Sequence, residues 1–129
     1  MLGDKKAQST VAVRDLGAAK KFYEGKLGLK PARTGGDGGQ DDVALYEAGG
    51  STLVVYVSKY AGTNRATGVT WSVGSEVDAI AKALKENGVS FERYDMPGMT
   101  HEGDVHVQGD MRVAWFQDPD GNIHALASE

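Results

Sequence analysis

The sequence predicts an α+β fold of two paired βαβββ modules, about residues 7–58 and about residues 66–128, that form an open half-barrel of mixed sheet. A strand followed by an amphipathic helix occurs twice, and the two copies lie roughly sixty residues apart. Val13 thereby corresponds to Val73, and Gly28 corresponds to Gly88. Because neither module can cover its sheet alone, we expect the helices on the outer face and a concave inner face that binds a small ligand.

The first module begins with a strand at Val11–Arg14, and Asp15 is the expected N-cap of a helix that ends at Gly28. Three extended segments are expected after this helix: Leu29–Arg33, Asp42–Glu47 and Thr52–Ser58. The glycine-rich stretch Thr34–Gln40 is expected to form an irregular hairpin tip, because glycine loses the most conformational freedom on ordering.

The second module begins with a strand at Val69–Val73, and Ser75 with Asp78 forms a capping-box pattern for a helix that stops at Asn87–Gly88. Three extended segments are expected after it: Val89–Tyr94, Met111–Phe116 and Asn122–Ala127, the last two as a closing hairpin. We interpret Met96–Asp110, which carries His101 and His106, as a glycine-punctuated surface loop.

Composition excludes several classes of function. The chain of 129 residues has no cysteine, so thiolate metal sites, thiol nucleophiles and disulfides are absent. A net charge of −4 argues against nucleic acid as a partner. No signal peptide or apolar run long enough for a bilayer is visible, so we expect a cytoplasmic protein without a membrane partner. No serine lies in a G-x-S-x-G elbow.

Two motifs, VAVRDLGAAKKFYEGKLGL at Val11–Leu29 and AWFQDPDGN at Ala114–Asn122, resemble the glyoxalase, bleomycin-resistance and extradiol-dioxygenase superfamily, also called the vicinal oxygen chelate superfamily. The resemblance covers nearly the whole chain, and the paired βαβββ modules of that superfamily agree with the duplication. Family members commonly pair, and a half-barrel has sheet edges that need covering. The resemblance therefore implies a homodimer.

Metal-dependent members of that superfamily hold a divalent ion with His and Glu side chains on the inner face. The resemblance places these ligand positions at Gln8, Tyr56, Gly68 (or its neighbour Thr67) and Ala125. None supplies an imidazole or a carboxylate, so we expect no metal and no other cofactor. His124 is next to the last position, and strand alternation aims it at the opposite face unless the register slips by one residue.

The candidate ligand-binding residues are those expected at the inner face or its rim: Gln8, Tyr56, Thr70, His101, Trp115, Phe116 and Ala125. Trp115 and Phe116 are adjacent in a strand, so only one of them faces the cavity. Tyr56 has an equal alternative as a buried structural tyrosine. Trp71 shares the parity of Val69 and is expected in the core on the helix side.

Two classes of function fit these residues. The first is a metal-free protein of the bleomycin-resistance type that binds a small, partly aromatic organic molecule. The second is an enzyme, either a metal-independent lyase or isomerase that uses Tyr56 or a loop histidine, or a metal-dependent glyoxalase or dioxygenase. The metal-dependent enzyme requires that the strand register assigned to the ligand positions is wrong. The sequence places no Asp, Glu or His clearly on the inner face, which favours binding over catalysis. A purely structural or regulatory subunit, whose cavity is filled by its own side chains, is a third alternative.

Overall fold

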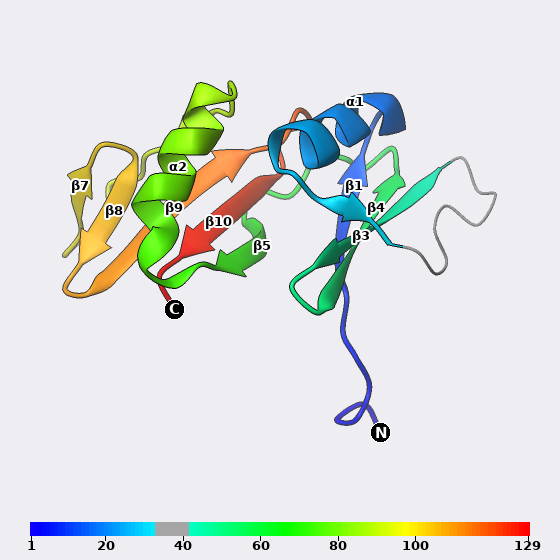
Figure 1. The fold of residues 1–129 in the computed structure, drawn as a ribbon, viewed down its shortest axis with the longest axis horizontal. Coiled ribbons are helices and arrows are strands. Elements are labelled where there is room, and N and C mark those ends of the chain that lie inside the picture. The colour runs from blue at the N-terminus through cyan, green and yellow to red at the C-terminus, as the bar shows by residue number, and fades with distance from the viewer. Residues whose placement is uncertain (33–41) are drawn as a thin grey trace. The chain divides into compact units, whose positions relative to one another are not determined.

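The computed structural model describes residues 1–32 and 42–129, so the predicted hairpin tip Thr34–Gln40 lies outside the described residues. The chain divides into two compact units, residues 1–61 and 62–129. Each unit has a helix lying across one face of its own mixed sheet (Figure 1), which confirms the α+β class. The described helices are all too short or too polar to span a lipid bilayer.

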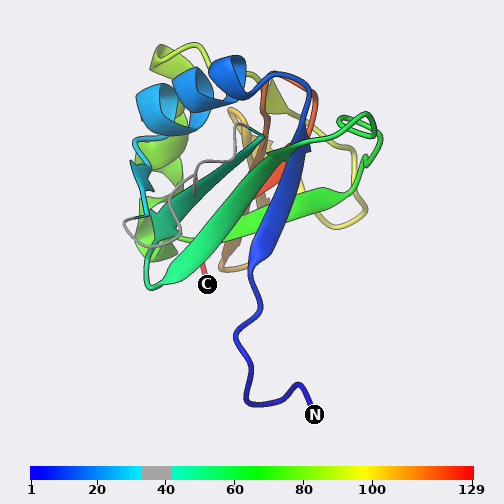
Figure 2. The same ribbon diagram turned by 90° about the vertical axis from the view of Figure 1, so that its right-hand side faces the viewer.

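Unit one follows the predicted order of strand, helix and three strands. Its elements are β1 (Ser9–Val13), α1 (Leu16–Lys20), a π-helical continuation (Lys21–Lys26), β2 (Lys30–Pro31), β3 (Val43–Ala48) and β4 (Ser51–Val57). The described strands are ordered β1-β4-β3-β2, and β1 is parallel to β4. Residues 1–8 are exposed and lead away from β1 as an extended tail (Figure 2).

The first helix begins at the predicted cap. The carboxylate of Asp15 accepts hydrogen bonds from the backbone N–H groups of Gly17 at 3.3 Å and Ala18 at 3.2 Å. The helical segment ends before Gly28, whose φ of 76° lies in the left-handed region that glycine adopts without strain. The side chains that this segment buries are Ala19, Phe22 and Tyr23.

Unit two begins in the predicted way and then departs from it. Its elements are β5 (Thr67–Ser72), a 3-10 turn (Gly74–Glu76), α2 (Val77–Glu86), β6 (Phe91–Glu92), β7 (Thr100–Glu102), β8 (Val105–Gln108), β9 (Met111–Gln117) and β10 (Ile123–Ala127). The strand order is β5-β10-β9-β8-β7, β6 also pairs with β9, and β5 is parallel to β10. Among the described residues, five strands rather than three therefore follow the helix.

The additional strands come from the segment that we expected to be a loop. Residues 100–102 and 105–108 form the hairpin β7–β8, in which His101 pairs directly with His106. The turn between the strands begins at Gly103, whose φ is 63°, as a two-residue hairpin connection requires. The loop prediction was wrong because it was based on the glycines alone. The alternation of side chains on either side of the glycines indicates strands.

The ends of α2 were predicted with mixed success. The capping box was wrong, because Ser75 lies inside the 3-10 turn and no side chain caps the helix at Glu76. The C-terminal end was predicted correctly: Asn87 is the C-cap, and Gly88 follows with a φ of 86°. The buried stripe of α2 consists of Val77, Ala81 and Leu84.

A side-chain contact identifies the face of the unit-two sheet that α2 covers. The guanidinium of Arg112 on β9 lies 2.9 Å from the carboxylate of Asp78 on α2. Because side chains alternate along a strand, Phe116 shares this helix face with Arg112. We call the opposite face the distal face; on β9 it carries Val113, Trp115 and Gln117.

Candidate functional site

Three of the predicted ligand-binding residues lie in a row across the distal face. Ala125 on β10 pairs with Trp115 on β9 and with Thr70 on β5. Paired residues of neighbouring strands point to the same face of a sheet, so the three side chains are direct neighbours. Thr70 is exposed, Trp115 is half-buried and Ala125 is buried.

The indole of Trp115 lies across β10. Its Nε1–H donates a hydrogen bond of 3.1 Å to Oγ1 of Thr67 on β5, two strands away from β9. The ring packs against the buried side chains of Val113, Ala125 and Ala127. The indole can cross β10 at this point because residue 125 carries only a methyl group.

Two rings, those of Tyr94 and His106, pack on Trp115, and the ring of His101 packs on His106. We call these four residues the aromatic cluster: Tyr94, His101, His106 and Trp115. The ring centroid of Trp115 lies 5.2 Å from that of Tyr94 and 4.7 Å from that of His106, both edge to face. The imidazoles of His101 and His106 are 4.6 Å apart, also edge to face. These are the distances and angles at which aromatic rings attract one another.

The backbone of Tyr94 joins the two histidines. Its N–H donates to Nε2 of His106 at 2.8 Å, and its carbonyl oxygen accepts from Nε2 of His101 at 2.9 Å. One peptide residue therefore fixes the orientation of both imidazole rings. His106 is fully buried and His101 is half-buried.

The environment of the cluster favours its neutral groups. Burial lowers the pKa of His106, and the nearby charge of a protonated His101 lowers it further. Burial also raises the pKa of the Tyr94 phenol, with a smaller contribution from the carboxylate of Glu92. The phenol of Tyr94 therefore stays protonated at neutral pH, and His106 stays neutral.

Glu92 places a carboxylate on the distal face. It pairs with Trp115 across β6 and β9, and its carboxylate accepts a hydrogen bond from the side-chain amide of Gln117. Glu92 and Tyr94 are not among the residues predicted to bind a ligand. They are two positions apart in the predicted extended segment Val89–Tyr94, and this spacing alone indicates that both side chains lie on one face.

Phe116 is the one predicted residue of this unit that lies on the helix face. Its ring is fully buried, stacks on Trp71 at 6.0 Å and lies 5.8 Å from Phe91. Only one of the adjacent residues Trp115 and Phe116 was expected to face away from the helix, and that residue is Trp115. Trp71 lies on the helix side, as its parity predicted.

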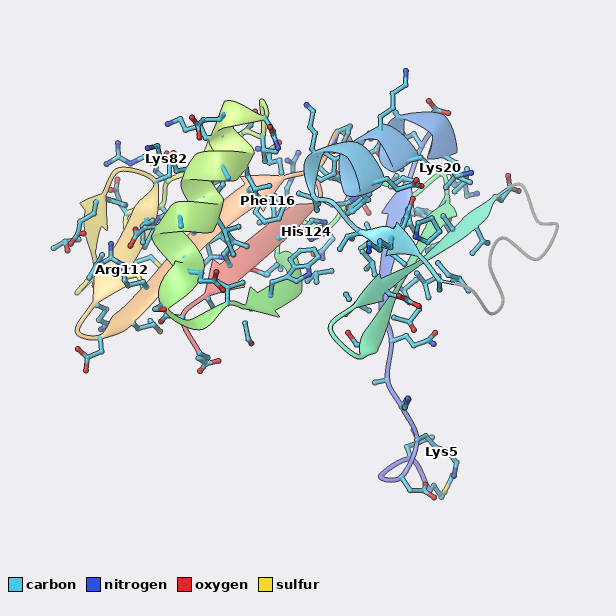
Figure 3. All side chains as sticks on the ribbon, viewed as in Figure 1. Lys5, Lys20, Lys82, Arg112, Phe116 and His124 are labelled. Carbon is cyan, nitrogen blue, oxygen red and sulfur yellow. The ribbon has the colours of Figure 1, made fainter. Side chains whose placement is uncertain are left out.

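His124 also lies on the helix face, opposite Ala125, as strand alternation predicted. It pairs with Phe116, which Figure 3 shows beside it. Its ring packs edge to face on Trp71 at 5.7 Å, and it is fully buried. The pairing with β5 shifts between Ile123 and His124, but this irregularity leaves the face of His124 unchanged. Burial lowers the pKa of His124 to about 4.

The remaining two predicted residues, Gln8 and Tyr56, belong to unit one. Tyr56 on β4 is 37% exposed and pairs with Ala12, whereas Leu53 and Val55 of the same strand are buried. The alternative of a buried structural tyrosine is therefore wrong. Gln8 is exposed, comes directly before β1 and has the parity of Ala12.

Comparison of the sequence with protein-family models gives a match over residues 7–126 to the glyoxalase/bleomycin resistance protein/dioxygenase superfamily. The chain belongs to this superfamily. The resemblance expected from the two sequence motifs is thereby confirmed. A comparison with curated protein sequences found no significant match.

Solved structures support the fold of this superfamily member. The fosfomycin resistance protein FosX from Listeria monocytogenes is 18% identical, with a TM-score of 0.67 over 98% of this chain and 91% of that chain. FosX from Mesorhizobium loti is 13% identical, with a TM-score of 0.68 over 98% and 92%. A putative glyoxalase family protein from Bacillus anthracis is 14% identical, with a TM-score of 0.72 over 98% of each chain. At these identities the similarity shows the fold alone.

The superfamily's metal-ligand positions can now be compared with the residues present. Gly68 and Ala125 have no donor atom in their side chains, and the indole of Trp115 packs against Ala125 where a ligand side chain would project. Gln8 offers an amide and Tyr56 a phenol, so these positions do not fit a divalent ion that requires imidazole and carboxylate ligands. Within residues 1–32 and 42–129, no group of three or more His, Asp or Glu side chains could hold a metal ion.

Proposed function

We propose that this superfamily member binds a small, partly aromatic organic molecule on the distal face of unit two, without using a divalent metal ion. The observation that carries the proposal is the aromatic cluster around Trp115, whose rings are held in place by backbone and side-chain hydrogen bonds. Ligand sites of this kind combine apolar surface with a few fixed polar groups.

The residues around Trp115 supply both kinds of surface. The indole offers a flat apolar ring, while Thr70 and Tyr94 offer hydroxyl groups beside it. Because Tyr94 keeps its proton at neutral pH, its hydroxyl can donate as well as accept a hydrogen bond. An aromatic ligand with one or two polar substituents complements this arrangement.

A thermal-shift screen of small aromatic metabolites and antibiotics tests the proposal. Fosfomycin belongs in the screen because the similar structures include fosfomycin resistance proteins from two organisms. We expect Trp115→Leu to weaken the binding of a hit about two- to tenfold, since a stacked aromatic contact contributes about 0.5–1.5 kcal/mol beyond the area that it buries.

The matched control is Tyr60→Leu, which removes an aromatic ring that is 66% exposed on unit one. This variant should bind every hit as the unmodified protein does. Hits that bind equally well to the Trp115→Leu variant would show that the distal face is not the binding site.

A second candidate function is acid–base catalysis by a metal-independent lyase or isomerase. The structure favours it through Glu92 and His101, a carboxylate and an imidazole on the same face, which weakens the argument that the sequence made against catalysis. Mass spectrometry of each hit after incubation distinguishes the two candidates. Conversion that is lost in Glu92→Gln or His101→Asn, with binding retained, would establish the enzyme.

A further inference from the structure

We propose that the backbone of Tyr94 holds His101 and His106 in opposite neutral tautomers, which makes Nδ1 of His101 the proton-accepting atom of the ligand site. This inference rests on the proposed function and adds the chemical class of the ligand: an aromatic molecule with a weakly acidic hydroxyl group, such as a phenol.

The tautomer of His106 follows from its hydrogen bond. A backbone N–H can only donate, so Nε2 of His106, 2.8 Å from the nitrogen of Tyr94, must carry a lone pair. The proton of the neutral ring is then on Nδ1. This atom is buried.

The tautomer of His101 follows in the same way and is the opposite one. A carbonyl oxygen can only accept, so Nε2 of His101, 2.9 Å from the oxygen of Tyr94, must carry a proton. In the neutral ring the lone pair is then on Nδ1. Within the described part of the chain, the hydrogen bond to Tyr94 is the only one that the side chain of His101 makes.

Only one of these imidazoles can accept a proton at no structural cost. A proton on Nε2 of His106 would break the hydrogen bond from Tyr94 and place a charge in a fully buried ring. Arg93 and a protonated His101 are close enough to oppose that charge further. His101 can accept a proton on Nδ1 and still donate from Nε2. His106 is therefore a positioning residue, and His101 is the acceptor.

The surroundings of His101 determine which kind of ligand can donate a proton or a hydrogen bond to it. Its ring packs edge to face on His106, which in turn packs on Trp115, so the acceptor atom belongs to an aromatic surface. The carboxylate of Glu92, on the same face, already accepts a hydrogen bond from Gln117. An aromatic ring with a hydroxyl group places apolar area on the rings and its O–H on Nδ1 of His101.

The first test is a proton–nitrogen correlation spectrum of the ligand-free protein with isotope-labelled histidine, which reports the tautomer of each ring directly. We expect His101 to carry its proton on Nε2 and His106 on Nδ1 at neutral pH. The reverse assignment for either ring would overturn the inference whether or not a ligand is found.

The second test uses para-cresol and its methyl ether, two probes that differ only in the O–H donor. We expect para-cresol to bind about two- to tenfold more tightly, the range that one neutral hydrogen bond contributes. The preference should disappear in His101→Phe, or in His101→Gln if the first variant is unfolded. Tyr60→Phe is the matched control, because it removes an exposed tyrosine hydroxyl on unit one, outside the aromatic cluster, and should keep the preference.

The outcomes separate this inference from the proposed function. Equal binding of both probes at Trp115 would overturn the proton-accepting role and leave the binding function intact. A site that binds neither probe but binds other aromatic molecules would overturn the phenol class. The absence of any ligand for the distal face would overturn the proposed function and the ligand class together.

Discussion

Acid should destabilise this protein through His124, whose imidazole is fully buried on the helix face against Trp71 and Phe116. Burial lowers its pKa from the ordinary 6.5 to about 4, while the carboxylate of Asp118 and a backbone hydrogen bond at Ile123 act in the opposite direction. The folded protein therefore holds this ring neutral at a pH where the unfolded chain protonates it.

The magnitude follows from the two pKa values. Their difference of about 2.5, at about 1.4 kcal/mol for each pKa unit, corresponds to about 3–4 kcal/mol. Above pH 6.5 the ring is neutral in both states, and the stability is complete. Between pH 6.5 and about 4 only the unfolded chain takes up the proton, so the free energy of unfolding falls. Below about 4 both states are protonated, and His124 causes no further loss.

Urea unfolding at intervals from pH 7 down to pH 4 measures this loss. We expect the free energy of unfolding to decrease by up to about 3–4 kcal/mol from His124, with a contribution of the same sign from His106, whose pKa is also lowered. The control is His124→Leu. Because this substitution also changes packing, the two proteins are compared by how steeply the free energy of unfolding changes with pH and not by its absolute value. An identical slope in this variant would refute the reasoning.

Two further predictions concern stability. Asp118→Ala should lower the free energy of unfolding by about 2–4 kcal/mol, because the buried carboxylate accepts hydrogen bonds of 2.9 and 2.7 Å from the backbone and side chain of Asn122. Asp118→Asn keeps one acceptor oxygen and should lose less stability in urea unfolding. Equal losses in the two variants would contradict this account. Tyr46→Phe should lower the free energy of unfolding by about 1 kcal/mol by removing the hydroxyl that donates to Glu24 at 2.8 Å, and an unchanged thermal midpoint would contradict that role.

The strand and helix pattern of this chain is local, and most of it could be predicted. The cap at Asp15 and the end of α2 at Asn87–Gly88 depend on residues a few positions apart. The face of His124 relative to Ala125 follows from alternation alone. The hairpin β7–β8 was missed because its glycines indicate a loop and a hairpin turn equally well.

The candidate site depends on contacts that no local pattern reveals. Alternation separates Trp115 from Phe116, but only the contact between Arg112 and Asp78 shows which of them lies under α2. The hydrogen bond from Tyr94 to His106 joins residues that are brought together because β6 and β8 both pair with β9. Such a contact is a property of the folded sheet and has no signature in residue spacing.

The most direct measurement of the proposed function uses the two tryptophans of the chain, whose indole N–H signals can be resolved by NMR and assigned with Trp71→Phe and Trp115→Phe. Trp71 packs on the helix face and Trp115 on the distal face, so each reports on one side of the same sheet. We predict that aromatic ligands found in the screen shift the Trp115 signal in a saturable way and leave the Trp71 signal nearly unchanged. Ligands that shift only Trp71, or that bind without changing Trp115, would contradict the account.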